Sequence, residues 1–310
     1  MNYSHEPVLS KEIISHLNLN KGDRHIDMTT GGGGHLDLAL GLGANCFAFD
    51  QDQDSFNFLI DKYTKLGWKK IKTEETSVTL EKGSQQLILV NSNFVNFEDY
   101  VGNTKFKSVL FDFGMSSYQI EQSERGFSFM RDEVLDMRMD KRLGVTAQDL
   151  INVLSVNELT TLFQKYGEDR YSGLYAKAIV RDRKLKKIKT TKELVDLIVK
   201  ICPVKERKKL HPATRIFQAL RIAVNDELHS IQACLPKIAL HLEQDGRVLT
   251  ITFHSLEEKL VTEFIAERSD LKDEVKTILP EESEIRKNPR SRSAKLTVIK
   301  INNKKQYEKE

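Results

Sequence analysis

The sequence predicts an α/β protein with a Rossmann-like parallel sheet into which an all-helical domain is inserted. Three observations lead to this prediction. A glycine-rich turn, TTGGGGH, follows a short apolar run at 25–28 and precedes a helix-like segment. Other apolar runs before residue 115 end in, or are followed by, an aspartate. Helical patterning then fills 146–245, and strand-like segments return at 247–253. Alternating strands and helices are typical of open parallel sheets.

The glycine turn predicts a ligand site. Glycine accepts positive φ and allows close backbone approach, and the first N–H groups of a following helix favour anions. The turn lacks the GK[ST] ending of a P-loop, and Leu36 breaks the GxGxxG spacing. We therefore expect a nucleoside-like ligand with little phosphate, for which S-adenosylmethionine is the leading candidate. An ordinary glycine-rich turn is the alternative.

Three aspartates lie at the ends of segments that we predict as strands. Asp27 ends the run before the glycine turn, Asp50 follows a run at 46–49, and Asp112 lies within SVLFDF at 108–113. The carboxyl ends of parallel strands share the edge at which open α/β sheets bind ligands. Asp50 also lies at the end of the second predicted strand, where doubly wound folds have a carboxylate that accepts hydrogen bonds from ribose hydroxyls.

The composition of the segments between these strands predicts their secondary structure. A helix is expected at 55–66, with Asp52 and Asp54 at its start, where acidic side chains suit the helix dipole. Residues 68–84 are predicted as a loop or hairpin, and a strand at 86–90 leads to Phe94. The Phe94 ring could lie against an adenine or pack in the core.

The middle of the chain changes character. Residues 115–140 mix aromatic, methionine and charged side chains without a period, which is more typical of a functional loop than of disorder. Three capping-box starts then predict helices: Thr146 with Asp149, Ser155 with Glu158, and Thr190 with Glu193. Cys202-Pro203 should end the helix that begins after Thr190.

Strand character returns at 247–253, a helix should follow to about residue 268, and a last strand is expected at 296–301. We therefore assign 1–122 and 220–310 to one α/β domain. Residues 123–219 are assigned to an inserted helical domain for substrate recognition.

Composition and charge narrow the class of protein. No apolar run approaches the ~18 residues of a membrane helix, and the N-terminus shows no secretory signal pattern. Three separated cysteines and scattered histidines indicate a reducing, cytoplasmic compartment without a metal site. Net charge is +3, but basic side chains cluster at 181–192, 205–209 and 286–295. Such clusters are compatible with nucleic acid, and solvated helix faces are the alternative.

The chain resembles the bacterial RsmH/MraW family of 16S ribosomal RNA (cytosine-N4)-methyltransferases. The matching motifs run almost end to end: HEPVL, GGGGH, AFDQD, FDFGMSS, ERGFSFM, LDMRMD, KYGEDRY, HPATRIFQALRIAVNDEL, FHSLE and PRSRSAKL. The resemblance implies a class I methyltransferase that uses S-adenosylmethionine to methylate a cytidine of the decoding region, within the small ribosomal subunit. No membrane partner is implied, and the oligomeric state stays open between monomer and homodimer.

The resemblance also implies a cofactor site. Its residues would be Gly33, Gly34, His35, Asp50, Phe94, Asp112 and Gln119. Three departures are visible: Met28-Thr29-Thr30 follows Asp27 where DGT or DCT is usual, FDFGMSS replaces DLGVSS, and 270–285 is short. The first and third bear on loop geometry and RNA contacts.

For catalysis we consider Asp112 together with Ser116, Ser117 and Asp136. Cytosine N4 is a poor nucleophile, so positioning and acceptors for the amino hydrogens should matter most. A serine or a nearby carbonyl would orient the amino group, and Asp136 or Asp140 could accept the proton.

For RNA, Phe127 and Phe129 are candidates for stacking on the base, with core packing as the alternative. Phosphates could be held by Arg138, Arg142 and Arg215. Two other functions remain open: a methyltransferase acting on another RNA base, and a ribosome-assembly factor that uses the cofactor site as a sensor.

Overall fold

The computed structural model describes residues 7–203, 211–268 and 275–301. The chain divides into two compact units, one formed by Ser116–Glu227 and the other by Asn2–Met115 with Leu228–Glu310. The predicted division at 219/220 falls inside helix α10 (Ala213–Asn225), which continues past it. Since a helix is one continuous element, the inserted unit is longer than expected at this end. Its role in substrate recognition stays a prediction.

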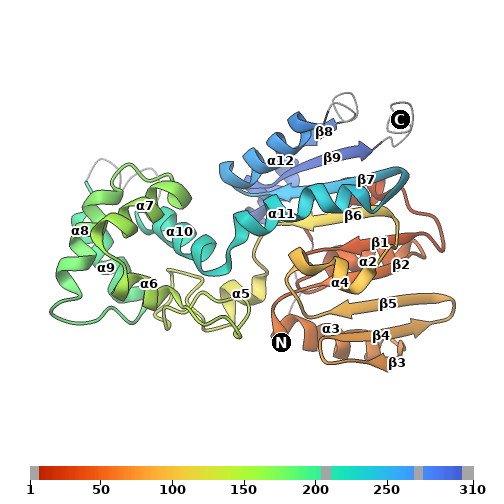
Figure 1. Ribbon diagram of the computed structural model, residues 1–310, viewed down its shortest axis with the longest axis horizontal. Coiled ribbons are helices and arrows are strands. Elements are labelled where there is room, and N and C mark those ends of the chain that lie inside the picture. The colour runs from red at the N-terminus through yellow and green to blue at the C-terminus, as the bar shows by residue number, and fades with distance from the viewer. Residues whose placement is uncertain (1–6, 204–210, 269–274, 302–310) are drawn as a thin grey trace. The chain divides into compact units, whose positions relative to one another are not determined.

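The larger unit contains a nine-stranded sheet in the order β3-β4-β5-β2-β1-β6-β7-β9-β8 (Figure 1). The strands are β1 (Arg24–Asp27), β2 (Asn45–Phe49), β3 (Lys69–Thr73), β4 (Ser77–Lys82), β5 (Gln85–Val90), β6 (Phe106–Asp112), β7 (Leu242–Thr252), β8 (Val275–Ile278) and β9 (Lys295–Ile301). Strands β5, β2, β1, β6 and β7 are parallel neighbours in that order. This is the 3-2-1-4-5 order of doubly wound sheets, which confirms the Rossmann-like prediction.

Helices cover both faces of this sheet. Apolar side chains of α1 (Ser10–Leu17), α2 (Gly34–Gly41) and α3 (Gln53–Lys65) share one core with strand residues such as Leu110 and Leu249. Side chains of α4 (Glu98–Val101), α11 (Glu227–Leu240) and α12 (Ser255–Glu267) share a second core with Val109 and Val248. Consecutive strand residues thus point to opposite cores, and both faces of the sheet are buried. The unit also contains η1 (Phe94–Asn96), α13 (Glu282–Lys287) and η3 (Pro289–Ser293).

Two expectations for this unit need correction. The helical block ends at Leu240 and not at 245, because β7 already begins at Leu242. This strand starts with the polar stretch LEQDG, which hides its first residues from an apolar pattern. The short strand β8 was not predicted at all; it pairs antiparallel with β9 at the edge of the sheet. Residues 68–84 form a hairpin, β3–β4.

The smaller unit is helical, with α5 (Ser117–Glu121), α6 (Ala147–Val153), α7 (Val156–Gly167), α8 (Ser172–Asp182), α9 (Thr191–Ile201) and α10. All three predicted capping boxes are formed, at Thr146, Ser155 and Thr190. Helix α9 ends before Cys202-Pro203, as expected. The basic cluster at 205–209 lies outside the described residues.

Gly167 allows α7 to approach α10 closely, and we expect Gly167→Ala to destabilise the smaller unit. A Cβ at this position would lie 2.6 Å from the Arg215 carbonyl oxygen, which is backbone and cannot rotate away. Overpacking of this kind costs about 1–3 kcal/mol. Urea unfolding measures the loss, with Gly144→Ala as the control, since a Cβ there meets nothing within 4 Å. Equal stability of the two variants would contradict the prediction.

Candidate cofactor and active site

The three predicted strand-end acids lie at one edge of the sheet. Strand β1 lies between β2 and β6, with Asp27 paired in register with Ala48 and Leu110. Asp50 directly follows β2, and Asp112 ends β6. The strands are parallel, so their carboxyl ends bring these carboxylates and the turn after β1 together.

Asp50 holds the glycine turn with its carboxylate. Its Oδ2 accepts a hydrogen bond from the Gly31 N–H at 2.8 Å, and its Oδ1 accepts one from the Asp52 N–H at 2.8 Å. A carboxylate oxygen can accept more than one hydrogen bond. The side chain is only half-buried, so Asp50 can both shape the turn and contact a ligand.

Asp27 is buried below the same turn. Its Oδ1 accepts from the Thr29 N–H at 3.1 Å, whereas Oδ2 has no hydrogen-bond partner in the described structure. Burial raises the pKa of Asp27 to about 7; the Thr29 hydrogen bond opposes this shift, and the charges of Asp112 and Asp50 add to it. A buried acceptor without a partner is unfavourable unless it is protonated or meets a donor from a ligand.

We expect this buried acid to make stability depend on pH. The ordinary Asp27 pKa is 3.8 and its folded-state value is about 7. Between these values the unfolded chain releases the proton while the folded protein keeps it, so the free energy of unfolding falls as pH rises. Relative to Asp27→Asn, wild-type protein should lose about 2–4 kcal/mol from pH 4 to 7 and little more above. Urea unfolding at several pH values tests this; parallel curves for the two proteins would contradict it.

His35 and Asp112 face each other at this edge. His35, on the first turn of α2, is buried, and its Nδ1 lies 3.5 Å from Asp112 Oδ2. Its Nε2 lies 2.8 Å from the Val8 carbonyl oxygen, which can only accept, so Nε2 carries a proton. Asp112 Oδ1 accepts from the Gly114 N–H at 3.0 Å. Burial raises the pKa of Asp112, and the nearby His35 opposes this effect.

The glycine turn itself shows why glycine is needed. Gly33 is the N-cap residue of α2 with φ 77°, and a Cβ there would lie 2.8 Å from Leu59 Cδ2. Gly34 opens the helix, and a Cβ there would lie 3.1 Å from Pro7 Cβ. The N–H groups of this first helical turn have no intrahelical acceptor and can serve a ligand. The positive φ and the crowding at Gly33 therefore disfavour any residue with a Cβ at this point.

The role of one residue at this edge was not predicted from the sequence. The Thr29 hydroxyl accepts a hydrogen bond from the Asp112 N–H at 2.6 Å and so ties the glycine turn to the end of β6. Thr29 belongs to the stretch that departs from the family pattern, which is the signal that could have drawn attention to it.

Phe94 lies in η1 after β5 and is half-buried. Its ring meets the fully buried Phe111 edge to face, with centroids 5.5 Å apart. One side of the ring therefore packs on the core. The remaining exposure is compatible with a ligand contact, so both readings of Phe94 stand.

In the smaller unit, Ser116 and Gln119 form a capping box at the start of α5. The Ser116 hydroxyl accepts from the Gln119 N–H at 3.2 Å, and Gln119 Oε1 accepts from the Ser116 N–H at 3.1 Å. Both residues therefore have a structural role in addition to any chemical one. Ser117 is the first residue of the helix and is half-buried.

The acids and arginines of 136–142 are mutually paired. Asp136 receives two hydrogen bonds from the Arg138 guanidinium, each 2.8 Å long. Burial opposes the effect, but Arg138 holds the pKa of Asp136 below its ordinary value. Arg138 also donates to the carbonyls of Lys141 and Leu143, which makes it a loop brace. A strongly paired anion is a poor proton acceptor, so the structure weakens the case for Asp136 as a base.

The remaining RNA candidates differ in exposure. Phe127 is 6% exposed and packs beside Arg125, so it has the core role that was the alternative. Phe129 is half-buried and stacks on His211 with centroids 4.6 Å apart. The Arg142 side chain is 53% exposed although it pairs with Asp140. Arg215 is exposed and donates to the Glu168 carbonyl.

The described residues contain neither a candidate membrane span nor a candidate metal site. No helix in these ranges is long and apolar enough to cross a membrane. Nor does any group of three or more His, Cys, Asp or Glu side chains in the described parts of the chain have an arrangement that could hold a metal ion.

Known proteins resemble this chain over nearly its whole length. The model of the MraW methylase family matches residues 2–302. The ribosomal RNA small subunit methyltransferase H of Sulfurihydrogenibium sp. is 39% identical over 302 residues, covering 95% of this chain and 98% of that protein. Its namesake from Trichormus variabilis is 41% identical over 298 residues, covering 96% and 91%. A solved rRNA methylase from Streptococcus thermophilus aligns over 95% of both chains with 11% identity and a TM-score of 0.44. This similarity is too low to support an argument, so the fold is assigned from the strand order of the sheet.

Proposed function

Because the chain belongs to the MraW methylase family, we propose that it methylates N4 of a cytidine in the decoding region of 16S ribosomal RNA. The protein is an S-adenosylmethionine-dependent methyltransferase of small-subunit ribosomal RNA. The observation that carries the proposal is the meeting of the glycine turn with Asp27, Asp50 and Asp112 at one sheet edge. A ribosomal RNA substrate supports a cytoplasmic location, which we include in the proposal.

The residues at this edge fit S-adenosylmethionine. S-adenosylmethionine has ribose hydroxyls, a charged amino acid end and no pyrophosphate. These features suit a glycine turn that has neither P-loop nor GxGxxG spacing. Asp50 would accept from the ribose. The Gly33 N–H donates to the Thr30 carbonyl, so the N–H groups of the first helical turn that begins at Gly34 would meet the amino acid end. His35 and Asp112 would line the same edge, and Phe94 would lie near the adenine. The family resemblance alone assigns Gln119 to the cofactor site.

The bound cofactor supplies a methyl group on a sulfonium, and the protein must bring N4 in line with it. Of Asp112 and Asp136, Asp112 is the better proton acceptor. Its pKa is raised by burial, whereas that of Asp136 is held down by Arg138. A base works best when its pKa lies closer to the working pH. We therefore assign the N4 proton to Asp112.

The serines can be tested against their structural role. If Ser116 and Ser117 orient the amino group, the Ser116→Ala, Ser117→Ala double variant should lose about 10- to 100-fold in turnover. Ser116→Asp keeps a side chain that can cap the helix, so it separates loss of the cap from loss of the hydroxyl. Turnover at the wild-type level in the double variant would contradict the serine assignment.

On the RNA side we propose Arg142 and Arg215 as phosphate contacts and Phe129 as the stacking surface. Both arginine residues are exposed, although Arg142 pairs with Asp140 and Arg215 donates to the Glu168 carbonyl, and the Phe129–His211 stack is an aromatic platform of the kind on which bases stack. Arg138 and Phe127 are assigned to the structure of the loop.

The deciding experiment supplies purified protein and methyl-labelled S-adenosylmethionine to small subunits from cells that lack this protein. The rRNA is digested to nucleosides, and the labelled product is identified by mass spectrometry. N4-methylcytidine supports the proposal. Label on another nucleoside overturns the choice of base, and cofactor binding without label on naked, partly assembled or complete particles favours the assembly-factor function.

A further inference from the structure

We propose that Glu284, on the short helix α13, is a positioning residue for the cofactor edge, and that it acts through the turn at 7–9 and His35. The inference rests on the proposed function, since it concerns the same site. All the residues involved belong to the sheet-containing unit, although 275 positions in the sequence separate Glu284 from Leu9.

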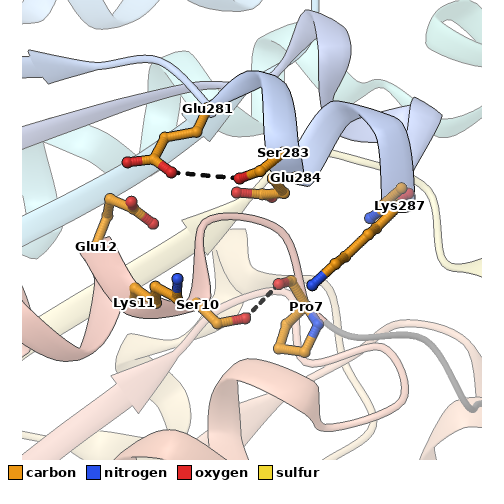
Figure 2. A pocket seen from close by; sticks show the side chains of 9 residues that line it. Pro7, Ser10, Lys11, Glu12, Glu281, Ser283, Glu284 and Lys287 are labelled. Atoms are coloured by element: carbon orange, nitrogen blue, oxygen red, sulfur yellow. Dashed lines mark hydrogen bonds between the residues drawn. The ribbon is translucent and has the colours of Figure 1, made fainter.

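The first contact joins α13 to the turn before α1. The Leu9 N–H donates to Glu284 Oε1 at 2.8 Å. Leu9 is fully buried and has the left-handed backbone conformation, with φ 55° and ψ 35°. A residue with a Cβ disfavours this conformation, so contacts from outside the turn must hold it. Figure 2 shows α13, with Glu284, facing the segment that carries Pro7 and Ser10.

The second contact joins the turn to the site. The carbonyl of Val8, the residue before Leu9, accepts the hydrogen bond from His35 Nε2 at 2.8 Å. This bond fixes the plane of the ring and the nitrogen that carries the proton, and it directs Nδ1 toward Asp112. The Pro7 ring also packs against Gly34 in the glycine turn. A shift of residues 7–9 would therefore move His35 and relax the packing on the turn.

The cavity at this junction does not suggest a ligand of its own. It has a volume of about 70 Å³ and is lined by residues of both segments, among them Ser10, Glu12, Glu281 and Lys287 (Figure 2). Ligand sites for molecules of nucleoside size occupy about 300 Å³ or more. We therefore assign the junction a positioning role.

The test compares three variants by calorimetric titration with S-adenosylmethionine. Glu284→Ala removes the acceptor and should raise the Kd about tenfold. Glu284→Gln keeps an acceptor oxygen and should stay within about twofold of wild type. Glu282→Ala is the matched control on the same helix, because that side chain is 88% exposed and contacts Arg286. Circular dichroism of each variant gives its folded fraction. Reversible unfolding raises the apparent Kd only by the inverse of that fraction, so a tenfold rise in a variant that is more than half folded cannot come from lost stability.

The route through His35 is tested with a double-mutant cycle. In an His35→Asn background, Glu284→Ala should have little further effect on Kd, because the residue through which it acts is gone. Equal effects of Glu284→Ala in both backgrounds, or an unchanged Kd in the single variant, would overturn the inference. Wild-type protein that binds the cofactor but methylates no RNA would contradict the proposed function and still leave these binding results decisive.

Discussion

The Asp112→Asn variant is expected to turn over about 100- to 1000-fold more slowly than wild type while it still binds S-adenosylmethionine. Asparagine keeps an oxygen for the Gly114 N–H, so the end of β6 should retain its shape. It cannot accept a proton, and it removes the charge that faces His35 Nδ1. Single-turnover methylation of small subunits measures the chemical step directly.

The control for this variant is Asp99→Asn, which removes an exposed carboxylate of α4 in the same unit. Its turnover should equal that of wild type. If Asp112→Asn reduced cofactor binding and left single-turnover rates unchanged at saturation, Asp112 would be a binding residue and another group would take the proton.

The Asp50→Ala variant is expected to bind S-adenosylmethionine about 100-fold more weakly. The substitution removes the acceptor for the ribose and also the two hydrogen bonds that hold the Gly31 and Asp52 N–H groups. Hydrogen bonds to a charged group contribute about 1.5–3 kcal/mol each, and one or two such losses correspond to this factor. Calorimetric titration gives the Kd.

Asp61→Ala provides the comparison for Asp50, because Asp61 is an exposed acid of α3 paired with Lys65. It should leave the Kd unchanged. Asp50→Asn, which keeps one acceptor oxygen, should lie between wild type and Asp50→Ala. A Kd for Asp50→Ala within about threefold of wild type would show that this carboxylate does not contact the cofactor.

Features that depend on neighbours in the sequence were predictable. The capping boxes at Thr146, Ser155 and Thr190 form because their two partners are three residues apart, within one helical turn. The strand-end acids were predictable because an aspartate at the end of an apolar run is a local sequence pattern. The same kind of pattern missed β8 and the start of β7, since an edge strand and a polar strand end lack the apolar signal.

The chemical roles of individual side chains were less predictable, because they depend on partners. Asp136 and Asp112 are both acids in motifs of the family, but Arg138 pairs with one, and burial raises the pKa of the other. Similarly, Phe127 and Phe129 are two residues apart, yet the first is buried and the second stacks on His211. Residue type alone cannot tell a paired acid from an unpaired one, or a buried phenylalanine from one that stacks on a histidine.

By itself, the sequence determined the α/β class, the helical insertion, the family and the acids at the glycine turn, because these follow from periodicity and motifs along the chain. Tertiary structure alone decided which acid is paired, where the inserted unit ends, and that Glu284 contacts the turn before α1. Glu284 and Leu9 are far apart in sequence, and the Asp136–Arg138 pair, although local, forms only in the folded loop. Burial and hydrogen bonds of this kind exist only once the chain has folded.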